Sequence, residues 1–192
     1  ISPRRSWETS RILMGAYFDE LCRSMEYLSR DPRTVFIGQA VAVRGTAMTT
    51  TLVNVDDHKK IELPVAEEMQ MGISTGMALA GFVPVTFYPR WNFLLLAVNQ
   101  LVNHLDKVKH MSRGGFQPKV IIRTGIGSER PLNPQCQHLG DFTDAFRLML
   151  INVEVIRLDD PEDIFPAYKK ALERTDGKCT IIVEWGDYYA TK

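Results

Sequence analysis

Glu67 stands near the start of a segment that is lined mainly with small and apolar side chains, LPVAEEMQMGISTGMALAG at 63–81. The apolar spacing predicts a helix over 65–80, with Glu67 in its first turn. A carboxyl group in such a setting could act as an acid or base. The simpler alternative is that Glu67 and Glu68 only favour the positive end of a helix dipole.

The same helix would carry small residues at four-residue intervals: Gly72, Gly76 and Ala80. Residues at this spacing fall on one stripe of a helix, where small side chains let another backbone approach closely. A glycine inside a helix costs roughly 1 kcal/mol relative to alanine, so two of them indicate a packing contact. Glu67 would lie about one turn before this stripe, near the point where the helix meets a partner.

A second candidate for chemistry is His138, in the segment GIGSERPLNPQCQHLG at 125–140. A loop of this length between a strand and a helix is usually functional or disordered. Histidine can exchange a proton near neutral pH, although a histidine in a polar loop is more often simply exposed. We interpret the other three histidines as solvated: His58, His104 and His110.

The elements that must position these residues alternate along the chain. Helices are expected from Trp7, capped by Ser6, to Asp31-Pro32, and at 65–80, 91–112, 141–150 and after Pro161. Strands are expected at 34–38, 83–88, 119–124, 153–158 and 179–185. This alternation predicts the α/β class, with a parallel sheet covered by helices on both faces, as a single domain over 1–192. Ligands of such sheets gather beyond the carboxyl ends of the strands.

Residues 39–62 are harder to interpret, because polar threonines at 49–51 are followed by the charged run DDHKK at 56–60. We expect a surface loop here, with a short strand before Pro64. Gly81 is expected to end the helix over 65–80.

Composition narrows the class of protein. Lys+Arg and Asp+Glu number 23 each in 192 residues, so the net charge predicts neither a nucleic-acid partner nor a membrane surface. No apolar run approaches the ~20 residues of a membrane span. Three widely spaced cysteines, Cys22, Cys136 and Cys179, favour reduced thiols and a cytoplasmic location. The sequence contains no phosphate-binding glycine loop, metal-ligand His/Cys cluster or nucleophile-elbow serine, which argues against hydrolases and nucleotidases.

Four segments in order, LPVAEEMQMGISTGMALAGFVPV, RWNFLLLAVNQLVNHLDKVKHMSRGG, VIIRTGIG and CQH, together resemble the β subunit of the decarboxylase component of the pyruvate and branched-chain 2-oxoacid dehydrogenase complexes. These are thiamine-diphosphate enzymes, and the segment concerned is their transketolase-like pyrimidine-binding domain. The resemblance covers about 63–140 and, more loosely, 7–38.

The resemblance implies roles for four residues. Glu67 matches the glutamate that bonds the ring nitrogen of the cofactor's aminopyrimidine and favours the tautomer that removes the thiazolium proton. Phe93 matches the aromatic residue that stacks on this ring, although without the resemblance it would be read as core. Val65 matches an apolar residue beside the ring. His138 matches a histidine on the substrate side. Glu68 lies about 100° further round the helix than Glu67 and could not replace it.

Departures from the family pattern shape the expected assembly. Gln39 and Ala40 stand where two acidic residues are usual, and the loop before His138 is longer than usual. The sequence ends at Lys192 without the family's C-terminal domain, which makes membership of a dehydrogenase complex doubtful. It also lacks the Gly-Asp-Gly segment that binds diphosphate and Mg²⁺, so no metal ligand is assigned to this chain.

The resemblance therefore predicts a β-type subunit that activates the ring of thiamine diphosphate. An α-type chain would hold the diphosphate and Mg²⁺, most simply in an α2β2 assembly with the active site at the interface. The expected reaction is decarboxylation of a 2-oxoacid with acyl or aldehyde transfer. Two alternatives stay open: a subunit of a split transketolase-like enzyme that transfers a ketol unit, and a catalytically silent interaction subunit.

Overall fold

A six-stranded sheet forms the centre of the computed structural model, which describes residues 7–43, 46–127, 129 and 133–189. Every strand pair is parallel, in the order β2-β1-β3-β4-β6-β5. The strands are β1 Thr34–Gly38, β2 Lys60–Glu62, β3 Val83–Tyr88, β4 Ile121–Ile126, β5 Val153–Arg157 and β6 Cys179–Trp185. This arrangement confirms the predicted α/β fold.

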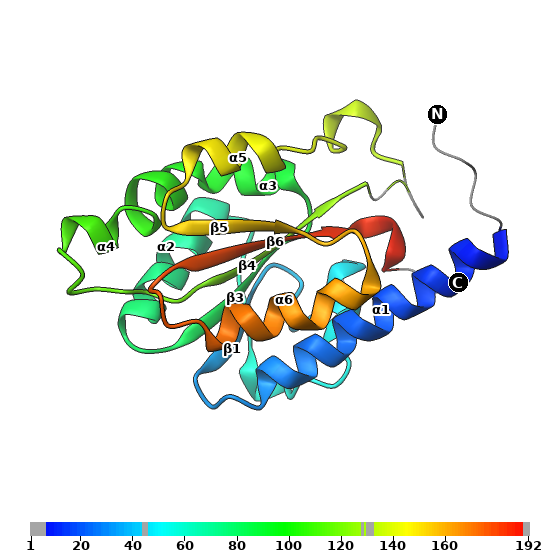
Figure 1. The fold of residues 1–192 in the computed structure, drawn as a ribbon, viewed down its shortest axis with the longest axis horizontal. Helices are drawn as coiled ribbons and strands as arrows, with labels where there is room; N and C mark the ends of the chain where they lie inside the picture. The colour runs from blue at the N-terminus through cyan, green and yellow to red at the C-terminus, as the bar shows by residue number, and fades with distance from the viewer. Residues whose placement is uncertain (1–6, 44–45, 128, 130–132, 190–192) are drawn as a thin grey trace.

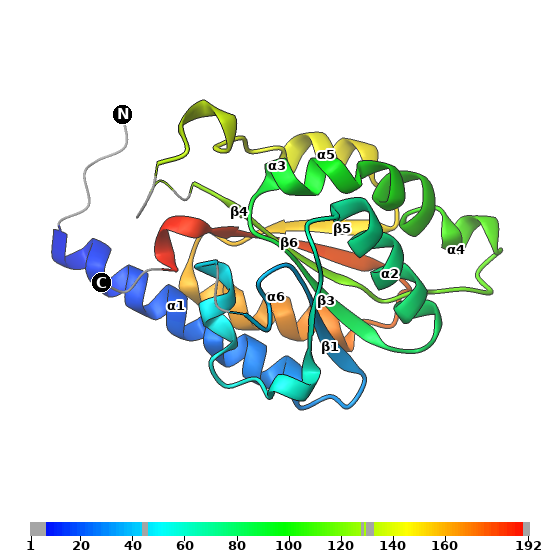
Figure 2. The ribbon, with the colours of Figure 1, turned by 180° about the vertical axis from the view of Figure 1, so that it is seen from behind.

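Helices cover both faces of the sheet, as Figures 1 and 2 show. The α-helices are α1 Trp7–Ser29, α2 Glu67–Leu79, α3 Trp91–Leu94, α4 Val108–Met111, α5 Thr143–Met149 and α6 Pro161–Glu173. On one face α1 and α6 lie side by side, and on the other lie α2, α3 and α5. The two faces bury separate apolar cores, because strands of a parallel sheet covered on both sides are apolar on both sides.

Helix α2 follows the expected course. It spans Glu67–Leu79, within the predicted 65–80. Gly81 has φ 95°, a left-handed conformation that glycine adopts readily, and it ends the helix as predicted.

The prediction of one long α-helix over 91–112 is wrong. The chain instead passes from α3 through a 3₁₀ turn at Leu95–Ala97 and a π-helix at Gln100–Leu105 to α4. Asp106 explains part of this change: its backbone N–H donates to the carbonyl of Leu101 at 2.9 Å, and its buried carboxylate accepts from the backbone N–H groups of Ile151 and Asn152. The π-helix, which is wider than an α-helix, thus ends with Asp106 beside the turn that precedes β5.

The segment 39–62 contains the expected short strand, β2, but it is not simply a surface loop. A 3₁₀ helix at Met48–Leu52 buries Met48 and Leu52 in the core. Thr51 is also buried, and its hydroxyl accepts from the Arg123 guanidinium at 3.0 Å. Arg123 forms a fully buried ion pair with Glu184 on β6, so this segment closes one side of a buried charged cluster.

All three cysteines carry free thiols, as predicted. Cys179 lies buried in β6, where burial raises the pKa of its thiol to about 12. Cys22 is half-buried and Cys136 is exposed. Within the ranges that the structure describes, no helix is long and apolar enough to cross a membrane.

Candidate functional site

A small crevice lies at the carboxyl ends of β1, β2 and β3, where the first turn of α2 meets the start of α3. It is lined by Gln39, Pro64, Val65, Ala66, Glu67, Gln70, Phe87, Tyr88, Pro89 and Phe93. The structure thus brings together three residues that the sequence singles out: Val65, Glu67 and Phe93. Their position at the carboxyl edge is where parallel sheets bind ligands.

Glu67 is the first residue of α2 and is half-buried. Ala66 before it has a non-helical backbone, with φ −159° and ψ 74°, so the helix cannot begin earlier. The Tyr88 hydroxyl donates to the backbone carbonyl of Glu67 at 3.2 Å. Burial raises the pKa of Tyr88 well above its usual value, and the nearby charge of Glu67 raises it further. The carboxyl group of Glu67 therefore lies at the edge where β3 ends.

Glu68 points elsewhere, as the helical geometry predicts. Its carboxylate is exposed and accepts a hydrogen bond from the Asn99 side-chain amide at 3.1 Å. Of the two adjacent acids, only Glu67 lines the crevice.

Gln70 is a member of the site that our sequence analysis did not identify. It is 2% exposed, and its amide nitrogen donates to the Thr86 hydroxyl at 2.8 Å and to the Phe87 carbonyl at 2.8 Å. A buried amide with both N–H groups satisfied fixes the first turn of α2 against β3. The available signal was its position three residues after Glu67 on the apolar side of the helix, where a polar side chain is unusual.

Phe93 and His138 come together from segments that are 45 residues apart. Their ring centroids are 5.2 Å apart with an interplanar angle of 40°. Both side chains are half-buried. His138 does not line the crevice itself but stands beside the Phe93 ring that does. Its Nδ1 atom is buried and has no hydrogen-bond partner among the described residues.

The turn after β1 contains Gln39 and Ala40, the positions where the family usually has two acidic residues, and here Glu62 stabilises it. Ala40 has φ 57°, and the carboxylate of Glu62 accepts from the backbone N–H groups of Ala40 at 2.5 Å, Ala42 at 2.8 Å and Val43 at 3.2 Å. Burial opposes ionisation of Glu62, but these backbone donors outweigh it and lower the pKa of the carboxyl group. Glu62 thus holds the turn that places Gln39 in the crevice.

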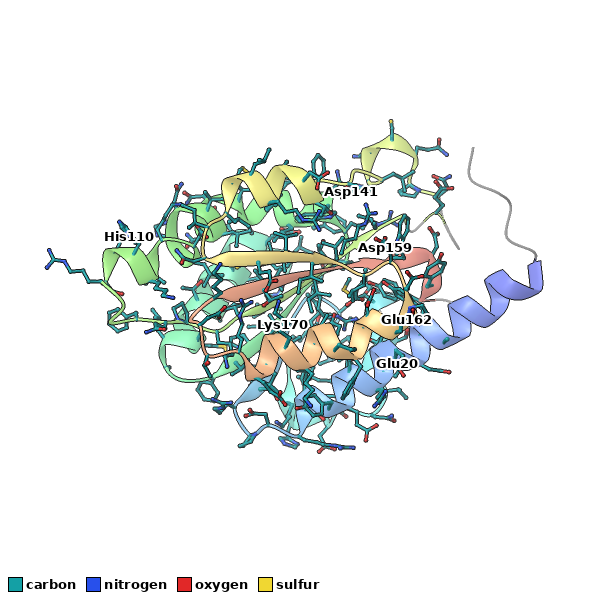
Figure 3. The ribbon with its side chains drawn as sticks, viewed as in Figure 1. Glu20, His110, Asp141, Asp159, Glu162 and Lys170 are labelled. Carbon is teal, nitrogen blue, oxygen red and sulfur yellow. The ribbon has the colours of Figure 1, made fainter. Side chains whose placement is uncertain are left out.

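The remaining histidines lie outside this site. His58, His104 and His110 are exposed, and Figure 3 shows His110 on α4, far from the loop that bears His138. No group of three or more His, Cys, Asp or Glu side chains within the described ranges could hold a metal ion.

The glycine stripe does not make a close contact inside this chain. A Cβ atom added at Gly76 would meet nothing within 4 Å, and one added at Gly72 would meet only the side chain of Gln100. The side of α2 that packs on the sheet is instead formed by Gln70, Met71, Ser74 and Ala78. The predicted close approach is therefore not satisfied by any described part of the chain.

A shallow groove runs along this outer side of α2. It is lined by Ala66, Glu67, Glu68, Met69, Gly72, Ile73, Leu96 and Gln100. Several of its apolar side chains are strongly exposed, including Leu96 at 62% and Met69 at 45%. We call this surface the α2 groove, and one end of it is Glu67.

Comparison with known proteins assigns the family. The model of the transketolase pyrimidine-binding domain matches residues 20–189 of the 192. The chain therefore belongs to this family, as the resemblance indicated, and enzymes of the family depend on thiamine diphosphate.

Curated relatives are β subunits of 2-oxoacid dehydrogenases. The chain is 28% identical over 156 residues to the 3-methyl-2-oxobutanoate dehydrogenase subunit beta of Mycobacterium tuberculosis, covering 78% of this chain and 43% of the relative. It is 28% identical over 183 residues to the mitochondrial pyruvate dehydrogenase E1 component subunit beta of Drosophila melanogaster, covering 91% and 49%. The chain thus spans less than half of the length of these relatives.

Solved structures share the fold at low sequence identity. A structure described as a split gene transketolase, inactive beta4 tetramer, has a TM-score of 0.67 at 16% identity, over 88% of this chain and 50% of that one. Transketolase from Campylobacter jejuni has a TM-score of 0.68 at 17% identity, over 87% and 25%.

Proposed function

We propose that this chain is the β-type subunit of a split thiamine-diphosphate enzyme that decarboxylates a 2-oxoacid and transfers the resulting acyl or aldehyde unit. The observation that carries the proposal is the convergence of Glu67, Phe93 and Val65 in one crevice, with His138 against the Phe93 ring, in a chain of the pyrimidine-binding family. The 2-oxoacid class is supported by the names of the curated relatives.

The donor groups of the crevice fit one half of the cofactor. A carboxyl group, an aromatic ring and an aliphatic side chain suit a flat ring with nitrogen atoms at its edge. A diphosphate with Mg²⁺ needs several oxygen ligands in near-octahedral geometry. The described residues supply no such cluster, so in this proposal the partner chain holds the diphosphate and the metal.

Each residue would have its own task. The Glu67 carboxyl would hold a proton at the ring nitrogen, and its place at the fixed start of α2 would set the distance. Phe93 and Val65 would lie against the ring and exclude water. His138 would hold or deliver a proton on the side where substrate enters. When bound, the cofactor supplies the carbon nucleophile that adds to the substrate's carbonyl group.

The α2 groove supports the need for a partner. It exposes Leu96 and Met69 beside Glu67, and the small residues Gly76 and Ala80 are exposed further along α2. Apolar and small residues together on a surface suit a packed interface. A split gene transketolase of similar fold is described as an inactive beta4 tetramer, which agrees with activity that requires a second kind of chain.

The similarity in fold to transketolases favours one alternative, a subunit that transfers a two-carbon ketol unit between sugar phosphates. A catalytically silent interaction subunit is the third reading. The three proposals differ in substrate and in the need for Glu67, so one set of measurements separates them.

The test is to measure binding of thiamine diphosphate with Mg²⁺ by isothermal titration calorimetry, for this chain, for a candidate α-type chain and for their mixture. Tight binding is expected only for the mixture. The mixture should then decarboxylate pyruvate or 3-methyl-2-oxobutanoate. Turnover of a ketose phosphate instead would establish the transferase reading, and cofactor-loaded but inactive mixtures would establish the silent one.

A further inference from the structure

Arg90 connects the two aromatic members of the site. It immediately precedes α3, in extended backbone conformation with φ −147° and ψ 153°. Its backbone carbonyl accepts from the N–H of Phe93 at 3.0 Å. Its guanidinium Nη1 donates to the backbone carbonyl of His138 at 3.3 Å. One residue thus holds the turn that bears Phe93 and the loop that bears His138.

We propose that Arg90 is a positioning residue that sets the His138 imidazole beside the Phe93 ring. This inference deepens the proposed function and rests on it for its catalytic meaning. The His138 imidazole ring has no hydrogen-bond partner at Nδ1 within the described residues. The backbone that carries the ring and the Phe93 ring, 5.2 Å away, are the described contacts from which we argue its position.

The character of arginine suits this task. Burial lowers the pKa of Arg90, while the charge of Asp187 raises it. The guanidinium stays charged, because an arginine side chain is in practice always protonated in proteins. A charged donor forms a stronger hydrogen bond to a carbonyl than a neutral one. Lysine would keep the charge but has a shorter reach and no planar fork.

The other end of the loop has a hydrogen bond of its own. The Asp187 carboxylate, from the turn after β6, accepts from the backbone N–H of Glu129 at 2.7 Å. Gly127 has φ 66°, a left-handed conformation that favours glycine, and a Cβ atom added there would lie 2.5 Å from the Asp187 carboxylate. Because Arg90 is not a member of the Glu129–Asp187 hydrogen bond, loss of Arg90 should act chiefly on the His138 end.

Nuclear magnetic resonance of the 192-residue chain tests the geometry without cofactor, partner or turnover. The probe is the nuclear Overhauser effect between the ring protons of Phe93 and His138. We expect it in the parent chain, its loss together with shifted His138 ring signals in Arg90→Met, and partial retention in Arg90→Lys.

Arg147→Met is the matched control. The Arg147 guanidinium also donates to a backbone carbonyl, that of Val155, at 3.3 Å, but it lies on α5. This variant should leave the Phe93–His138 signal unchanged. A signal that survives in Arg90→Met would overturn the proposal, as would equal losses in the Arg90 and Arg147 variants. If Arg90→Met fails to fold, Arg90→Lys provides the test. An undiminished Phe93–His138 signal in Arg90→Lys, together with unchanged His138 chemical shifts, would also overturn the proposal.

In the complex with its partner, Arg90→Met should lower kcat about tenfold or more, with little change in cofactor affinity, because misplacing a group by about 1 Å can cost as much as 100-fold. Added to His138→Ala, it should cause no further loss, since both changes remove one function. Independent, additive losses would contradict the positioning role. A complex without any turnover would refute the proposed function but leave the resonance result standing, so the two failures are distinguishable.

Discussion

The Tyr88 hydroxyl donates to the backbone carbonyl of Glu67 at 3.2 Å, joining the last residue of β3 to the first residue of α2. Gln70 joins the same two elements one helical turn later, through its bonds to Thr86 and Phe87. The start of α2 is therefore fixed to the sheet by two side chains. A carboxyl group placed on this turn is held by rigid elements, which is what a site working over short distances requires.

Replacing Glu67 with glutamine tests the central residue. The change keeps the shape of the side chain but removes its ionisable proton, so we expect turnover in the complex with the partner chain to fall by about 10²–10⁴-fold. Assembly should be unaffected. Steady-state kinetics and analytical ultracentrifugation of the same samples measure the two properties.

Glu68→Gln is the control for this change. Glu68 is adjacent, exposed and bonded to Asn99. It lines the α2 groove but not the crevice, so in the fully assembled complex its loss should change turnover less than about twofold. Equal activity of the two variants would contradict the role of Glu67 and favour the silent-subunit reading.

Phe93→Leu should weaken cofactor binding more than it slows turnover. Leucine fills part of the volume but cannot stack on a flat ring, and aromatic pairs are worth about 0.5–1.5 kcal/mol beyond area burial. The expected rise in the Kd for thiamine diphosphate is therefore about threefold to tenfold. Phe116→Leu, at a residue that is 55% exposed, should leave the Kd unchanged in the same calorimetric titration. A rise of equal size in both variants would show that Phe93 acts through stability alone.

His138→Gln, unlike Phe93→Leu, should slow turnover more than it weakens cofactor binding. Glutamine retains polar atoms but cannot exchange a proton near neutral pH, so kcat should fall by at least about 10²-fold. Cofactor affinity should stay within about twofold, since His138 does not line the crevice. His110→Gln, on exposed α4, serves as the control. An unchanged kcat in His138→Gln would remove this residue from the mechanism.

The fold could be predicted because its strands are short, apolar and separated by helix-forming segments. β3 and β6 have the predicted bounds, 83–88 and 179–185. Part of the departure from the helix predicted at 91–112 accompanies Asp106, whose carboxylate accepts from the backbone N–H groups of Ile151 and Asn152, 45 and 46 residues away. A periodicity within one segment contains no information about such a distant partner.

The candidate site likewise contains residues that the sequence could predict and residues that it could not. Glu67, Phe93 and Val65 could be proposed from the sequence because each stands at a recognisable place in a family pattern, and the structure places all three in one crevice. Gln70 and Arg90 act through bonds to Phe87 and His138, partners that become neighbours only after folding. Their residue types alone predict an ordinary polar position on a helix and at a turn.

Gln70→Leu is predicted to destabilise the chain. Leucine is similar in size but leaves the Phe87 carbonyl and the Thr86 hydroxyl without their donor. Unsatisfied buried polar groups cost about 1–3 kcal/mol, so the free energy of unfolding in urea should fall by about that amount. Gln117→Leu is the control, because Gln117 is exposed and its side-chain amide donates to the Gly114 carbonyl. Its effect should stay within about 0.5 kcal/mol, and a similar loss in both variants would deny Gln70 any special role.

Gly76→Leu separates stability from association. An added side chain at Gly76 would meet nothing within 4 Å in this chain, and leucine is a better helix former than glycine by roughly 0.5–1 kcal/mol. The isolated chain should therefore be as stable as before or more so in urea. If the glycine stripe packs against a partner, the same side chain should clash there and raise the Kd of the complex at least tenfold. Gly15→Leu on α1 also has open space around it and should leave the Kd unchanged. Tight binding by Gly76→Leu would show that the partner uses another surface.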